Sequence, residues 1–266
     1  MPLLRPLIRA FLLLPLLATG LAAQTLNLGG SGGALGLLRE AGVTFREATG
    51  IQVVVMPSLG TQGGLRALAD GKIDLAVIGR ELSEAEAARG LRQVLVVRTP
   101  YGFATSLPNP PSLAAEVFAA YLREPRMKWP DGTPVRAVLR PATESDYVHM
   151  FAGFPGTDDA IATLRQRADI PVASSDQENL DLAESIPGSL VGTTLVQVVT
   201  ERRSLQFVPV NGIRPGVEAF EAGVYPRVKP FFFIARATQA AAVDPFLAFL
   251  RSGDGQAILR RSGILP

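Results

Sequence analysis

One segment, residues 49–82, restricts the fold more than any other part of the chain. It reads as a strand (Ile51–Met56), a Gly-rich turn (Gly60–Gly64), a short helix (Leu65–Ala69) and a second strand (Ile73–Ile78), which ends at Gly79 and Arg80. In open α/β sheets, ligands bind beyond the carboxyl ends of the strands. A helix N-terminus that follows glycines also offers free backbone N–H groups to an anion. The segment therefore predicts one half of an anion-binding cleft.

The rest of the chain continues this alternation. Apolar runs predict further strands at 91–97 with a continuation at 102–106, and at 135–139, 190–192 and 205–210. Helices are expected at 34–45, from the N-cap Ser112 to Tyr121, and at 146–152, 157–166, 177–183, 245–251 and 255–260. Strands that alternate with helices indicate an α/β fold with a mostly parallel sheet.

Two crossings divide the chain into lobes. A Pro-rich break at 107–111 marks the first crossing, and the strand at 205–210 marks the return. We therefore expect one lobe from 24–106 with 205–266 and a second lobe from 107–204. Ligand pockets favour the interface between such units, which predicts a cleft between the lobes.

The N-terminus, residues 1–23, has the layout of a cleaved signal peptide. Arg5 and Arg9 precede an apolar run from Ala10 to Leu17, and small residues end the segment at Ala22 and Ala23. The run is shorter than the roughly 20 residues that a bilayer span needs, so a membrane anchor is the weaker interpretation. We expect export to the periplasm.

Charge and cysteine content narrow the function further. The chain has 26 Lys and Arg against 24 Asp and Glu, and the leader holds two of the arginines and no acid. The mature chain is thus formally neutral, which gives no support for binding to nucleic acid or to a membrane surface. Without cysteine, disulfides and thiolate metal sites are excluded, and we expect no metal and no cofactor.

Several motifs together resemble the phosphate-binding proteins of bacterial ABC transporters. The motifs are Gly29-Gly30-Ser31-Gly32-Gly33, the segment 49–82, Met127–Gly132, Arg140-Pro141, Ser175–Glu178, Ile186–Gly192, and Gly223–Pro226 followed by Pro230–Ile234. The resemblance implies a two-lobed type II periplasmic-binding-protein fold that closes on its ligand by a hinge. It also implies a monomer that captures a small anion such as phosphate and delivers it to an ABC transporter permease.

The expected ligand-binding residues come from both lobes. Ser31, Gly32 and Gly33 could cradle an oxyanion, although glycines serve an ordinary turn equally well. Thr61 stands where the family places a ligand-binding hydroxyl, with a helix cap as the alternative role. Gly79 and Arg80 end a strand; a surface pair of Arg80 with Glu81 or Glu84 is the competing interpretation. Arg140 matches the family's arginine in the cleft, and guanidinium fits phosphate in a bidentate way.

The loop after Arg140 departs from the family, because it reads Thr143-Glu144-Ser145-Asp146 where the family has Gly, Ser and Thr. Ionised carboxylates only accept hydrogen bonds, so they repel a dianion unless the ligand carries a proton. Alternatively, Asp146 caps the next helix and Glu144 faces solvent, which leaves Thr143 and Ser145 for the ligand.

The residues do not favour an enzyme. His149 is the only histidine and is interpreted as a helix residue, and Trp129 as a packing residue. A catalytic triad or a metal site needs partners that the chain does not supply at a recognisable spacing. The preferred class is an exported solute receptor for a small oxyanion. The alternative is a degenerate receptor that acts as a sensor or interaction partner without binding phosphate.

Overall fold

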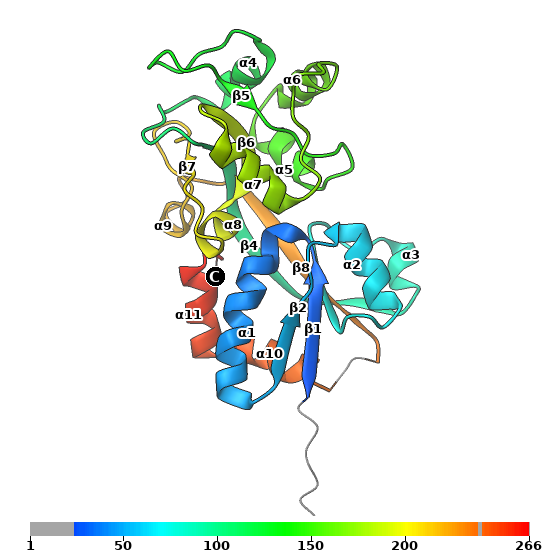
Figure 1. Cartoon of the computed structure of the whole chain (residues 1–266). Coiled ribbons are helices and arrows are strands. Elements are labelled where there is room, and N and C mark those ends of the chain that lie inside the picture. The colour runs from blue at the N-terminus through cyan, green and yellow to red at the C-terminus, as the bar shows by residue number, and fades with distance from the viewer. Residues whose placement is uncertain (1–23, 239–240, 266) are drawn as a thin grey trace, which may run out of the picture.

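A single long strand, β4 (Leu91–Thr105), runs through the whole molecule and joins its two halves (Figure 1). The computed structural model describes residues 24–238 and 241–265; the expected leader, 1–23, lies outside them. Up to Pro100, β4 pairs with β8 (Val228–Arg236), and from Tyr101 it pairs with β6 (Ser189–Thr194). The first part of β4 thus belongs to one lobe and its last part to the other.

The first lobe is built on five neighbouring strands of the sheet, in the order β2 (Gln52–Val55), β1 (Thr25–Gly30), β3 (Leu75–Ile78), β8 and β4. β1 lies between β2 and β3 with parallel pairing, and β3 continues antiparallel to β8. A 3-10 turn, η1 (Gly32–Ala34), leads from β1 into α1 (Leu35–Thr49). Helices α1, α10 (Val243–Arg251) and α11 (Gly253–Arg261) share one apolar core with these strands.

The other face of this sheet is covered by α2 (Gly60–Ala69), with the short α3 (Glu84–Ala87) beyond it (Figure 1). Two glycines permit the close packing of β1 against β3 and against α2. Gly30 has a φ of 126°, and a Cβ there would overlap the carbonyl of Val77. A Cβ at Gly64 would meet the Cα of Gly30 at 2.7 Å. The glycines thus bring the first turn of α2 to the carboxyl ends of β1 and β3.

The second lobe has a smaller sheet and mostly short helices. β5 (Arg136–Ala137) pairs parallel to β6, and β7 (Gln206–Phe207) pairs antiparallel to β4. Its helices are η2 (Ala115–Val117), α4 (Phe118–Arg123), α5 (Asp146–Gly153), α6 (Thr157–Leu164), α7 (Asp176–Ser185) and α9 (Val217–Glu221). Helix α8 (Leu195–Thr200) packs against both lobes, because Val196 belongs to the core of the first lobe while Leu195 and Val198 pack against a core of the second. Trp129 is buried in its core and donates to the carbonyl of Gly188 at 3.0 Å, which fits the expected packing role.

The structure corrects several expectations. The sheet is mixed, because among the described strands three pairings are parallel and four antiparallel. The glycines expected in a turn at 60–64 form the first half of α2. Ser112 does not begin a helix; its hydroxyl accepts from the backbone of Gly212. Residues between Leu205 and Tyr225 contribute to the cores of the second lobe, and the expected boundary at 205 stays a prediction.

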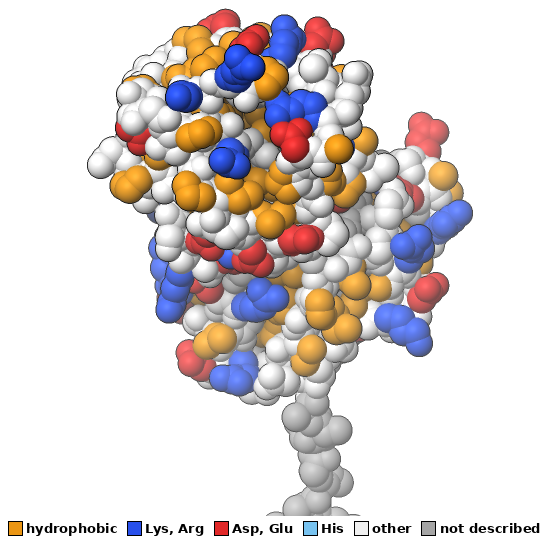
Figure 2. All heavy atoms as spheres, turned by 45° about the horizontal axis from the view of Figure 1, so that its top comes forward, with side chains coloured by type: hydrophobic (Ala, Val, Ile, Leu, Met, Phe, Trp, Pro, Cys, Tyr) orange, Lys and Arg blue, Asp and Glu red, His pale blue; other side chains and the backbone are white. Residues whose placement is uncertain are grey.

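Charged side chains are evenly mixed on the face that Figure 2 displays, with basic and acidic groups interspersed. This agrees with the near balance of charges in the sequence. No helix among the described residues is both long enough and apolar enough to cross a bilayer.

Candidate oxyanion site

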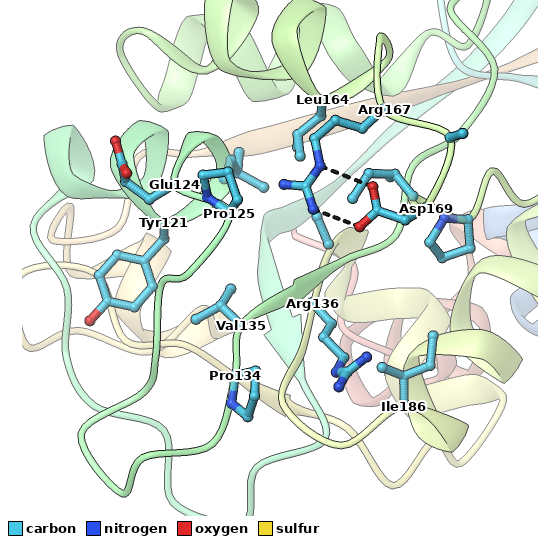
Figure 3. A pocket seen from close by; sticks show the side chains of 15 residues that line it. Tyr121, Glu124, Pro125, Pro134, Val135, Arg136, Leu164, Arg167, Asp169 and Ile186 are labelled. Carbon is cyan, nitrogen blue, oxygen red and sulfur yellow. Dashed lines mark hydrogen bonds and ion pairs between the residues drawn. The ribbon is translucent and has the colours of Figure 1, made fainter.

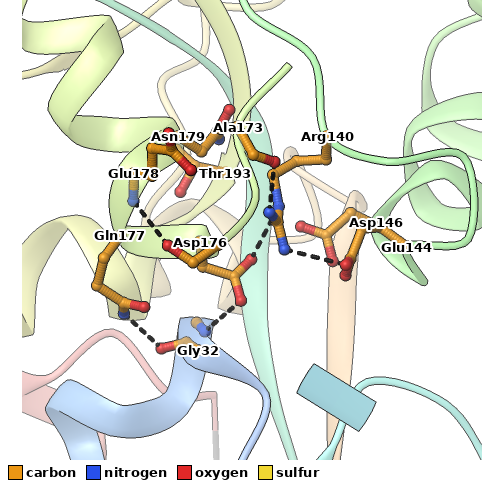
Figure 4. Close-up of polar contacts among 12 residues, drawn as sticks. Gly32, Arg140, Glu144, Asp146, Ala173, Asp176, Gln177, Glu178, Asn179 and Thr193 are labelled. Carbon is orange, nitrogen blue, oxygen red and sulfur yellow. Dashed lines mark hydrogen bonds and ion pairs between the residues drawn. The ribbon is translucent and has the colours of Figure 1, made fainter. Parts of the chain in front are cut away.

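The guanidinium of Arg140 is the centre of a cluster of polar contacts in the second lobe, beside its junction with the first lobe. Arg140 follows β5 and is only 6 % exposed, which is unusual for a charged residue. Its Nη1 donates to the carbonyl of Ala173 at 2.8 Å. The hydroxyl of Tyr147 accepts from the backbone N–H of Arg140 and donates to its carbonyl, at 2.9 and 2.7 Å. The main chain at Arg140 is therefore fixed, and the guanidinium is aimed at the junction of the lobes (Figure 4).

Glu144 forms an ion pair with one edge of this guanidinium. Its Oε1 lies 3.1 Å from Nη2 of Arg140, and a quarter of the Glu144 side chain is exposed. Burial raises the pKa of the Glu144 carboxyl, and Arg140 opposes this shift. The alternative in which Glu144 faces solvent is therefore wrong: the carboxylate is half-buried and paired.

Asp176 contacts the opposite edge of the guanidinium and also a backbone N–H group of the first lobe. Its Oδ1 is 3.7 Å from Nε of Arg140, while Oδ2 accepts from the backbone N–H of Gly33 at 3.1 Å. The neighbouring Gln177 donates to the carbonyl of Gly32 at 3.0 Å. The glycine loop that was expected to cradle an oxyanion thus contacts a carboxylate of the protein itself (Figure 4).

Lys229 and Asp146 form a second buried ion pair beside this cluster. Lys229 is 1 % exposed and comes from β8, and its ammonium contacts the Asp146 carboxylate. The expectation that Asp146 caps α5 is therefore wrong: no side chain caps that helix, and Asp146 is used in the ion pair.

The cluster is short of positive charge. It contains two cations, Arg140 and Lys229, and three carboxylates, Glu144, Asp146 and Asp176. Burial and the nearby Asp146 raise the pKa of Asp176, and Lys229 and Arg140 oppose this shift. An added anion must consequently displace a carboxylate, bring a proton, or do both.

Three buried polar atoms near Arg140 have no hydrogen-bond partner among the described residues: Arg140 Nε, Tyr101 Oη and Asn179 Oδ1. All three residues line the same narrow cavity of about 10 Å³ between β4, α5 and α7. Buried polar groups in native proteins are nearly always paired. A cavity of this size has room for about one water molecule, which could satisfy these atoms.

A much larger cavity, of about 750 Å³, opens between α2 and the loop that leads into α5. We call it the α2–α5 pocket. It is lined by residues of both lobes, including Thr61, Gly79, Arg80, Thr143, Glu144 and Ser145. A Cβ at Gly79 would overlap the Ser145 hydroxyl, so the lobes approach closely along this wall. Glu144 therefore stands between the pocket and Arg140.

Two predicted residues of this pocket have defined partners. The Thr61 hydroxyl lies in the first turn of α2 and accepts from the backbone N–H of Gly79 at 3.2 Å. Arg80 forms a bidentate pair with Glu86, at 2.9 and 2.8 Å, instead of pairing with the side chain of Glu81 or Glu84. The hydrogen bonds from Arg80 lower the pKa of Glu86 to about 2. Arg80 is thus a fixed part of the wall.

The predicted residues accordingly fall into two groups. Thr61, Gly79, Arg80, Thr143, Glu144 and Ser145 line the α2–α5 pocket, whereas Gly32, Gly33, Arg140 and Asp146 belong to the buried contacts next to it. Ser31 is buried and joins β3 through its backbone. Asp176, Lys229, Tyr101 and Asn179 also belong to these contacts or line the small cavity, and the sequence did not predict them as site residues.

A further cavity, of about 550 Å³, lies within the second lobe and away from this cluster (Figure 3). One of the two arginines that line this cavity, Arg167, is paired with Asp169 at 3.0 and 2.7 Å.

His149 lies in α5 as expected and lines the α2–α5 pocket, and burial lowers its pKa. Among residues 24–238 and 241–265, no group of His, Asp or Glu is arranged to hold a metal ion.

Comparison with known families identifies the class of protein. Residues 18–254 match a family model described as a PBP superfamily domain. The chain therefore belongs to the PBP superfamily, the periplasmic binding proteins, and its α/β fold is that of the type II members. No curated protein sequence matches the chain.

Solved structures agree with this fold at low sequence identity. A protein from Clostridium perfringens, named for a phosphate ABC transporter and solved with phosphate bound, is 14% identical with a TM-score of 0.74; 91% of this chain and 99% of that chain are covered. A phosphate transport receptor from Vibrio cholerae is 15% identical (TM-score 0.59) and the molybdate-binding protein of Azotobacter vinelandii 13% (0.58), each with 91% and 99% coverage. At these identities the likeness establishes the fold.

Proposed function

We propose that this protein is an exported solute receptor that binds a small oxyanion, with phosphate as the first candidate, and delivers it to an ABC transporter permease. The observation that carries the proposal is the buried Arg140 guanidinium, whose Nη2 pairs with Glu144 on the side of the α2–α5 pocket. A desolvated guanidinium at the junction of two lobes is suited to an oxyanion, since charge-assisted bonds are strong there. The role is binding, without catalysis.

Binding would proceed by exchange of one anion for another. Glu144 pairs with Arg140 from the side of the α2–α5 pocket and is the least buried of the three carboxylates. An incoming oxyanion can take its place at Nη2, and Glu144 then moves toward solvent or takes up a proton. Because the cluster already carries more carboxylates than cations, an oxyanion that brings its own proton, such as monohydrogen phosphate, is favoured over sulfate.

The test is the variant Glu144→Gln, which removes the competing charge. We expect its affinity for inorganic phosphate to rise about five- to tenfold, equivalent to about 1–1.4 kcal/mol. Wild-type affinity should approach that of the variant as the pH falls toward the raised pKa of Glu144, because protonation releases Arg140 in the same way. Calorimetric titration of both proteins over the same pH range measures this convergence. The ionisation of phosphate affects both affinities equally and therefore cancels in their ratio.

Glu84→Gln is the matched control, since Glu84 is exposed on α3 and lies outside the α2–α5 pocket. This change removes the same charge and should alter phosphate affinity less than twofold. If Glu144→Gln has no larger effect than Glu84→Gln, the exchange at Arg140 is refuted.

Export is the second part of the proposal and is supported by the layout of residues 1–23. Mass spectrometry of the protein from the periplasmic fraction should find an N-terminus at Ala23 or Gln24. A major form that retains Met1 would contradict export by cleavage.

A degenerate receptor without anion binding is the alternative, and one observation favours it. The Asp176 carboxylate already bonds to the N–H of Gly33 and faces Arg140, where an oxyanion would be expected. A ligand raises thermal stability if it binds only the folded state. Failure of phosphate, sulfate and molybdate to shift the melting temperature of the wild type and of Glu144→Gln would favour this alternative.

A further inference from the structure

We infer that the ligand of this cleft is an organic anion, a carboxylate or phosphate monoester with an apolar skeleton, whose body lies in the α2–α5 pocket. This inference rests on the proposed anion binding at Arg140 and specifies the ligand of the same cleft. It follows from the size of the pocket, the chemistry of its wall, and its position relative to Glu144.

Size is the first argument. A tetrahedral oxyanion has five heavy atoms and takes up about the room of two or three water molecules, roughly 60–90 Å³ at ~30 Å³ each. The α2–α5 pocket measures about 750 Å³, within the roughly 300–1,000 Å³ that is usual for sites of organic ligands. An inorganic oxyanion would leave most of the pocket to water.

The wall of the pocket supplies the second argument. Its lining includes the apolar side chains of Leu59, Val148, Pro230 and Phe232. The hydroxyls of Thr61 and Ser145 belong to the same lining. A lining that combines several apolar side chains with a few polar groups is typical of pockets that bind a carbon skeleton with a charged end. A site for a bare oxyanion requires only the polar groups.

Charge provides the third argument. The guanidinium of Arg66 stands at the rim of the pocket, exposed, and has no hydrogen bond or ion pair among the residues that the structure describes. By contrast, the glycine loop at the far side of the cluster is engaged by Asp176 and Gln177. A ligand therefore reaches Arg140 from the α2–α5 pocket, past Glu144, and its skeleton remains in the pocket that it came through.

The experiment compares three probes by calorimetry on the purified protein: inorganic phosphate, phenyl phosphate and benzoate. We expect at least one aromatic probe to bind ten times more tightly than inorganic phosphate. If phenyl phosphate binds more tightly than benzoate, the ligand is a phosphate ester. If benzoate binds more tightly, the ligand is a carboxylate. Inorganic phosphate that binds as tightly as both aromatic probes would overturn the inference, while the proposed function would stand.

Val148→Trp tests where the skeleton lies. Val148 is 67 % exposed on α5, so the larger side chain fills the pocket without disturbing a core. In this variant the ratio of the affinity for the aromatic probe to the affinity for inorganic phosphate should fall from about ten to about one. Val224→Trp is the control: Val224 is 52 % exposed and does not line the pocket, and its variant should keep the preference. A preference that survives Val148→Trp would overturn the inference. Binding of none of the three probes would also overturn it, and the proposed function would then be decided by the melting-temperature test with phosphate, sulfate and molybdate.

Discussion

Replacement of Lys229 by methionine is expected to lower the free energy of unfolding by about 3–5 kcal/mol. The ammonium is fully buried, contacts the Asp146 carboxylate, and lies 4.9 Å from the centre of the Phe231 ring. Methionine has a similar length, so little packing is lost. The cost arises because Asp146 is left as a buried carboxylate without its cation, which is far more destabilising than the loss of the pair as a whole.

The double variant Lys229→Met with Asp146→Leu distinguishes this cause from a packing defect. Because it removes both charges, it should recover most of the lost stability. Lys72→Met is the control: Lys72 is exposed, and its change should stay within about 0.5 kcal/mol. Urea denaturation gives the free energy of unfolding of the wild type and of the three variants. Equal losses in the single and double variants would contradict the interpretation.

The largest effect on binding is expected at Arg140. Arg140→Ala should weaken the binding of the best anion about 10- to 100-fold, since a charge-assisted hydrogen bond is worth roughly 1.5–3 kcal/mol. Arg140→Lys retains the charge but loses the planar fork that reaches Ala173, Glu144 and the ligand together. It should recover only part of the affinity.

Calorimetric titration of both Arg140 variants, alongside Arg167→Lys, provides the measurement. Arg167 is paired with Asp169 in the separate cavity of the second lobe, and its variant should bind as the wild type does. The lysine variant keeps a cation between Glu144 and Asp176, so it remains informative if Arg140→Ala is too unstable to purify. Unchanged affinity in either Arg140 variant would exclude the proposed role.

Much of the fold could be predicted because each element carries a local signal. The apolar run before Gly79 and the helical face at 34–45 correspond to β3 and α1. Two errors have a common cause in tertiary context. Glycines are poor helix formers, yet Gly60, Gly63 and Gly64 lie in α2, where Gly64 permits contact with Gly30. Pairing across the sheet also determined that β8 is antiparallel, which no local pattern reveals.

The site was only partly predictable for a similar reason. Residues after strands, such as Arg80 and Arg140, could be found because strand ends gather at one edge of a sheet. Asp176 and Lys229 could not be found in this way, because their importance depends on partners 143 and 83 positions away. A lysine directly before the apolar run 230–235 was the one available signal for Lys229, since charged residues are almost never buried without a partner.

Strand β4 has a consequence for how the two lobes share stability. Leu91, Val97, Phe103 and Ala104 of this one strand belong to four different apolar clusters, two in each lobe. Neither lobe can therefore lose its core without exposing part of a strand on which the other depends. We therefore expect the two lobes to unfold as one cooperative unit, so that a packing defect introduced far from the cleft in either lobe destabilises both walls of the site.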